Sequence, residues 1–135
     1  MFATSSNLIN FPETLPATTL ANDCYNNMFY GCSGMKTTPK LPATTLVSNC
    51  YKEMFKGCSS LNYIEALFIT EPNDSYTKDW VNGVAVTGTF IKNRNAMWNV
   101  TGNNGVPTGW TAYADNVLPP GNYKFGIANN VWVCG

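Results

Sequence analysis

Residues Leu15–Lys40 read LPATTLANDCYNNMFYGCSGMKTTPK, and residues Leu41–Ala66 read LPATTLVSNCYKEMFKGCSSLNYIEA. The two segments are identical at 13 of 26 positions. A fixed period of about 20 to 50 residues is typical of architectures in which similar units stack on one another. One unit is too small to bury its own apolar face, so we expect neighbouring units to lie over one another and share a core.

The apolar residues of each unit recur at intervals that predict one face of a short helix. The first unit has them at i, i+4, i+5, i+8 and i+9, as Leu20, Cys24, Tyr25, Met28 and Phe29. The second unit repeats them as Leu46, Cys50, Tyr51, Met54 and Phe55. The predicted fold class is an α/β solenoid of leucine-rich-repeat-like coils, each a short helix plus a short strand, with a β-rich C-terminal cap.

The remaining chain divides around these two units. Met1–Leu8 aligns with Met54–Leu61, which makes residues 1–14 a partial repeat and residues 1–66 the array. Since Met1 falls at an interior repeat position, we expect the chain to be the C-terminal part of a longer array. Residues 67–113 are expected to cap the stack, and residues 114–135 to form a hairpin-like tail. The four tryptophans lie beyond the repeats and suit capping, with a carbohydrate-stacking platform as the alternative: Trp80, Trp98, Trp110 and Trp132.

The pattern LPATTLxxxCYxxMFxGCSxL resembles the repeats of BspA-like leucine-rich-repeat surface proteins of Bacteroides-type gut bacteria. The segments Trp80–Phe90 and Gly105–Thr111 resemble the closing part of such arrays, so the resemblance covers about residues 1–113. It implies surface display with adhesion or ligand binding. The repeats also look like arrays of phages that infect these bacteria, and that resemblance implies a virion or tail-tip role.

Equivalent residues of stacked units are expected to form a structural ladder. The predicted pairs are Leu20 with Leu46, Cys24 with Cys50, Met28 with Met54, Phe29 with Phe55, and Cys32 with Cys58. The C-x7-C spacing without histidine favours buried thiols. Disulfides between coils and a zinc site are the alternatives, and Cys134 is left unpaired in each.

The composition favours no catalytic or charged-partner role. The chain has no histidine, and its eight carboxylates form no recurring pair, so we predict no enzyme activity, no cofactor and no metal. The formal net charge is zero and the eight basic residues are scattered, which argues against nucleic acid binding. No apolar stretch reaches the ~18 residues of a membrane-spanning helix.

We therefore expect a non-enzymatic recognition module that binds a protein or a carbohydrate at a cell surface. Its candidate binding residues are Tyr30, Tyr63, Tyr113 and Tyr123. The alternative function is a structural spacer or virion component whose repeats set length. Self-association through the array ends or the cap is a further expected contact, and the expected location is extracellular, either on an outer membrane or on a virion.

Overall fold

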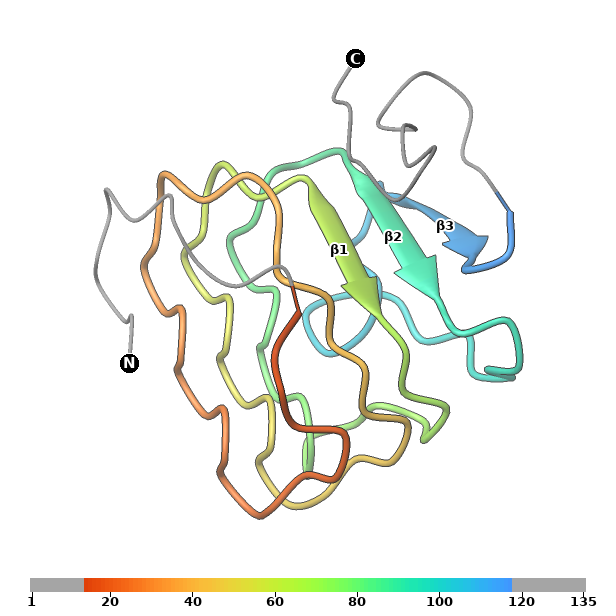
Figure 1. Cartoon of the computed structure of the whole chain (residues 1–135). Coiled ribbons are helices and arrows are strands. Elements are labelled where there is room, and N and C mark those ends of the chain that lie inside the picture. The colour runs from red at the N-terminus through yellow and green to blue at the C-terminus, as the bar shows by residue number, and fades with distance from the viewer. Residues whose placement is uncertain (1–13, 118–135) are drawn as a thin grey trace.

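Three short strands form one open parallel sheet in the order β1-β2-β3. The strands are β1 (Tyr63–Ala66), β2 (Thr89–Lys92) and β3 (Thr111–Ala114). The structure is a computed structural model that describes residues 14–117. Tyr63 pairs with Thr89, which is 26 residues further along the chain, and Thr89 pairs with Thr111. Each strand therefore belongs to a different coil, and successive coils lie side by side (Figure 1).

The predicted fold class is wrong. Residues 14–117 contain no helix, and their only strands are the three of one open sheet, so the coils are not helix-plus-strand units. The segments predicted as helices are instead runs of consecutive turns. We call these segments the turn ribbons and number them along the chain as ribbon 1 (21–32), ribbon 2 (47–58) and ribbon 3 (73–84).

Hydrogen bonding explains why a ribbon replaces the helix. In ribbon 1 the N–H groups of even-numbered residues donate three residues back, as Met28 does to Tyr25 O at 3.1 Å. The odd-numbered N–H groups donate to ribbon 2, as Tyr25 does to Cys50 O at 3.1 Å and Phe29 to Met54 O at 2.9 Å. A helix would bond all of these groups internally, whereas the ribbon uses half of them to join coils.

The ribbon repeats every four residues, a spacing close to the 3.6 residues per turn of a helix. Every fourth backbone position has a positive φ, as at Asp23, Asn27 and Gly31 in ribbon 1. Glycine, asparagine and aspartate tolerate this left-handed conformation better than other residues. Apolar side chains at i, i+4, i+5, i+8 and i+9 satisfy a four-residue period as well as the 3.6-residue period of a helix.

The stack continues after the sequence repeat ends. In ribbon 3 Trp80 N–H donates back to Thr77 O at 3.0 Å, and the Trp80 carbonyl accepts from Phe55 N–H at 2.9 Å. The positive φ also recurs at Asp79 and Gly83. Residues 67–92 therefore form a third coil in the same register, although few of their residues match the first two.

The core lies between the ribbons and the sheet and contains columns of stacked aromatic rings. The rings of Tyr25 and Tyr51 have centroids 6.2 Å apart, and those of Tyr51 and Trp80 are 5.7 Å apart. A second column stacks Phe29 on Phe55 at 5.7 Å with an interplanar angle of 8°. Each such pair contributes about 0.5–1.5 kcal/mol beyond its buried area.

Replacement of Glu53 by asparagine is expected to stabilise the chain by about 0.5–1 kcal/mol. Glu53 has φ 51°, and the equivalent residue of ribbon 1 is Asn27 with φ 60°. Its ion pair with Lys56 at 3.5 Å is partly exposed and offsets only a small part of this gain. Urea denaturation measures the change. Lys52→Asn, at a neighbouring position with negative φ, is the control, and an equal gain in both variants would contradict the explanation.

Candidate functional site

The outward face of the sheet brings together two of the four predicted binding residues. Side chains alternate between the two faces of a strand, and along β1 Ile64 and Ala66 are buried while Tyr63 is half-buried. The register places Tyr63 in one row with Thr89, and Tyr113 in the next row of the same face. Tyr63 and Tyr113 therefore lie on one face, on β1 and β3.

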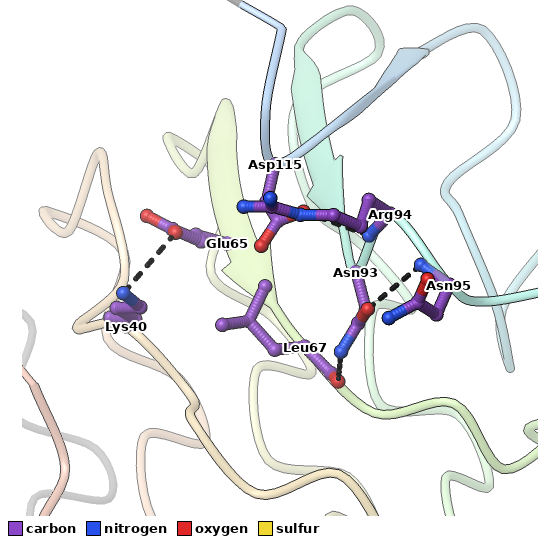
Figure 2. A network of polar contacts seen from close by, with 7 residues as sticks. All are labelled: Lys40, Glu65, Leu67, Asn93, Arg94, Asn95 and Asp115. Atoms are coloured by element: carbon purple, nitrogen blue, oxygen red, sulfur yellow. Dashed lines mark hydrogen bonds and ion pairs between the residues drawn. The ribbon is translucent and has the colours of Figure 1, made fainter.

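A polar cluster borders this face where the strands end. Lys40 Nζ lies 3.8 Å from Glu65 Oε2, and Arg94 Nε donates to Asp115 Oδ1 at 3.0 Å (Figure 2). Asn93 Nδ2 donates to the Leu67 carbonyl at 2.9 Å. The carboxyl ends of parallel strands meet at one sheet edge, which is why residues far apart in sequence gather here. We call the outward face and this cluster the sheet-face site, with residues Lys40, Tyr63, Glu65, Thr89, Arg94, Thr111, Tyr113 and Asp115.

The charges of the cluster are balanced and paired. Partial burial raises the pKa of the Asp115 carboxyl, but hydrogen bonds from the Arg94 side chain and backbone, together with its positive charge, lower that pKa more. The net result is a pKa below the ordinary value, which suits an ionised partner of Arg94. Nearby, burial lowers the pKa of Lys92, whose Nζ donates to the Trp98 carbonyl at 2.6 Å and lies 4.4 Å from the centroid of the Trp98 ring.

The Arg94–Asp115 pair predicts a small loss of stability in acid. The pKa of Asp115 is lower in the folded than in the unfolded chain. Its ionised carboxylate therefore stabilises the fold at pH values above the unfolded-state pKa of about 3.9, and this stabilisation is lost as the pH falls through the folded-state pKa. We expect this contribution to be below about 1 kcal/mol, because Arg94 is 54% exposed. Denaturation of the wild type and Arg94→Gln from pH 6 down to about pH 2 measures it. The difference in free energy of unfolding between the wild type and Arg94→Gln should shrink toward low pH. A difference that stays constant with pH would contradict this role of the ion pair.

The other two predicted binding residues do not join this site. Tyr30 lies half-buried in ribbon 1, whereas the site lies on the sheet. Tyr123 and the predicted hairpin-like tail beyond Val117 lie outside the described residues. The sequence prediction also missed Lys40, Glu65, Arg94 and Asp115. Their positions at or just beyond strand ends are the signal that could have identified them.

The ladder residues lie in the stacked coils. Leu46, Met54 and Phe55 are buried, as are their counterparts Leu20 and Phe29, while Met28 is half-buried. Cys58 Sγ donates to the Phe29 carbonyl at 3.1 Å. All four described cysteines are free thiols, of which the first is exposed and the others are buried: Cys24, Cys32, Cys50 and Cys58.

The thiols should differ strongly in reactivity. Burial raises the pKa of Cys50 to about 11 and that of Cys58 to about 12, and both side chains are inaccessible. The thiolate is the reactive species. We therefore expect Cys24 to react with a maleimide at pH 8 at least about a hundredfold faster than Cys50 or Cys58. Peptide mapping after timed labelling measures the rates. Labelling in urea is the control and should equalise them, whereas equal rates in the native chain would contradict the burial.

Residues 14–117 hold no group of three or more histidine, cysteine, aspartate or glutamate side chains that could bind a metal ion. The same residues include no helix that is long and apolar enough to cross a membrane. Comparisons with models of protein families, with curated proteins and with solved structures find no match for this chain.

Proposed function

We propose that this chain is a non-enzymatic recognition module that binds a protein or a carbohydrate through the sheet-face site. The observation that supports it is the placement of Tyr63 and Tyr113 on one outward face, beside the threonines of β2 and β3. Tyrosine offers a rigid surface that is apolar in its ring and polar at its hydroxyl, which suits recognition surfaces.

The paired charges at the edge of this face support a polar ligand. Lys40–Glu65 and Arg94–Asp115 present donors and acceptors with no excess of either sign. Such a border orients a ligand by hydrogen bonds while giving little attraction to nucleic acid or to a strongly charged surface. The low share of charged residues, 12%, fits our proposed location outside the cell, on a bacterial surface or a virion. The resemblance to BspA-like surface proteins leads to the same proposal.

The test is binding of the full chain to an immobilised glycan panel and to an immobilised panel of extracellular proteins. Any ligand found is then tested against the double variant Tyr63→Ser/Tyr113→Ser. We expect its affinity to fall at least about tenfold, since aromatic residues dominate binding energies. Tyr30→Ser is the matched control and should retain the wild-type affinity. A ligand whose binding survives the double variant, or is lost in the control alone, would overturn the assignment of the site.

A structural spacer is the second candidate, and one observation favours it. Tyr30 lies in ribbon 1 and not on the sheet-face site, so the predicted binding tyrosines that the structure describes do not form one patch. A spacer needs only a regular stack and no ligand. It predicts that neither panel yields a ligand and that the sheet-face variants fold and behave as the wild type does.

A further inference from the structure

The turn ribbons have a direction of hydrogen bonding that an ordinary strand lacks. In ribbon 1 every backbone N–H that bonds outside its own coil donates to a carbonyl of ribbon 2. In ribbon 2 every such N–H donates to a carbonyl of ribbon 3. The pairs Phe29 N to Met54 O and Phe55 N to Trp80 O, each at 2.9 Å, are examples. A β-strand edge offers alternating donors and acceptors, whereas each ribbon has a donor edge toward the C-terminus and an acceptor edge toward the N-terminus.

The donor edge of the last ribbon is covered by the loop of residues 99–106. Asp79 N–H donates to Asn104 Oδ1 at 2.8 Å, and Val81 N–H donates to the Asn103 carbonyl at 3.2 Å. The Thr77 hydroxyl donates to the Asn104 carbonyl at 2.7 Å. This loop therefore supplies the acceptors that a following coil would otherwise provide.

The acceptor edge of ribbon 1 has no such cover among residues 14–117. In ribbon 2 the carbonyls of Ser48, Cys50, Lys52, Met54 and Lys56 each accept a backbone N–H from ribbon 1. The equivalent carbonyls of ribbon 1 accept none from the described part of the chain: Asn22, Cys24, Asn26, Met28 and Tyr30. Ribbon 1 is the outermost of the three side-by-side ribbons in Figure 1.

Two side chains along this edge are more exposed than their counterparts in ribbon 2. Cys24 is exposed although Cys50 is fully buried, and Met28 is half-buried although Met54 is fully buried. The Asn26 Oδ1 atom is buried without a hydrogen-bond partner, which adds an unsatisfied acceptor at the same place. The edge thus combines a row of carbonyls that accept no backbone hydrogen bond from residues 14–117 with two side chains that are partly exposed.

We propose that this edge binds the donor edge of one further coil of the same ribbon geometry. The partner is a polypeptide segment that presents backbone N–H groups at every second residue. Its apolar side chains stand at the positions of Tyr25 and Met28, which are half-buried in ribbon 1. Glycine suits the partner at the position of Gly31, because Gly31 and its equivalents Gly57 and Gly83 all have a positive φ.

A second copy of this chain does not fit as the partner. If ribbon 1 of a second copy met this edge, carbonyl groups would face carbonyl groups. In ribbon 3 of that copy the N–H groups of Asp79 and Val81 already donate to Asn104 and Asn103. End-to-end association of copies is therefore disfavoured at both ends. We expect a monomer in analytical ultracentrifugation over a wide range of concentrations, and a dimer that protects Cys24 would overturn this choice of partner.

The decisive experiment inserts a copy of residues 15–40 between Thr14 and Leu15 of the full chain, with alanine for both cysteines of the inserted copy. The original Cys24 then lies beside a donor edge. Its maleimide labelling rate is expected to fall about tenfold or more, toward that of Cys50, because docking buries it.

The matched control carries proline at the inserted copies of Tyr25 and Phe29, which removes two of the donors. Cys24 should then react within about twofold of its rate in the natural chain. Slow labelling of Cys50 and Cys58 shows that the rest of the stack is folded. With the stack folded, an unchanged Cys24 rate in the first insertion, or equal protection in both insertions, would overturn the proposal. Neither result bears on the sheet-face site, which lies on the sheet away from the ribbons.

Discussion

Replacement of Trp80 by alanine is expected to lower the free energy of unfolding by about 3–5 kcal/mol, enough to unfold a marginally stable chain. Trp80 is fully buried, and its ring lies 5.6–5.8 Å, centroid to centroid, from those of Tyr51, Phe55 and Phe68. Its Nε1 also donates to the Gly105 carbonyl at 3.1 Å. The substitution therefore leaves a large cavity between the second and third coils and an unpaired acceptor in the end loop.

Urea denaturation followed by circular dichroism measures this loss. Trp80→Phe keeps most of the ring volume and should cost less than the alanine variant. Met97→Ala, at a side chain that is 92% exposed, is the surface control and should change stability by less than about 0.5 kcal/mol. If Trp80→Ala costs no more than Met97→Ala, Trp80 is not a core residue and the third coil is not packed as described.

Replacement of Gly105 by alanine is expected to cost about 3 kcal/mol, the upper part of the range for an overpacked site. A Cβ at this position would lie 2.2 Å from the Val100 carbonyl oxygen and 2.7 Å from its carbonyl carbon. Both contacts are with backbone, which cannot move aside as a flexible side chain can. Relief of the clash would displace the loop that accepts hydrogen bonds from the backbone N–H groups of Asp79 and Val81.

Gly102→Ala is the matched control for this effect. Gly102 has φ 109°, but a Cβ there meets no atom within 4 Å. The free energy of unfolding of Gly102→Ala should therefore fall by about 1–2 kcal/mol, which is the cost of placing alanine in the left-handed conformation. Thermal or urea unfolding compares the two variants. A loss at Gly105 no greater than that at Gly102 would show that the loop adapts to the extra carbon.

The sequence predicted some features of the fold well and missed others for identifiable reasons. The helix prediction failed because Cys24, Tyr25, Met28 and Phe29 recur with a spacing of four, which a helix and a turn ribbon share. The distinguishing signal was in the polar positions. Asp23, Asn27 and Gly31 are also four apart, and these residue types tolerate the positive φ that a helix never requires.

The site was predicted only in part. Tyr63 and Tyr113 share the outward face of the sheet, but nothing local in the sequence places Arg94 beside Asp115 or Lys40 beside Glu65. Those pairs depend on the register of parallel strands whose partners are 22 or 26 residues apart. Tyr30 was grouped with the sheet tyrosines because the sequence does not distinguish the two sides of a coil.

The amino-acid sequence by itself determined the 26-residue unit and the core side chains of ribbons 1 and 2, since an internal repeat of fixed period can bury its apolar residues only by stacking. The tertiary structure decided the conformation within each unit. Half of the ribbon N–H groups find their acceptors in the next coil, and a bond to another coil cannot be inferred from local residue preferences. Tertiary structure also extended the stack through residues 67–92, where Trp80 and its neighbours continue the register without repeating the sequence.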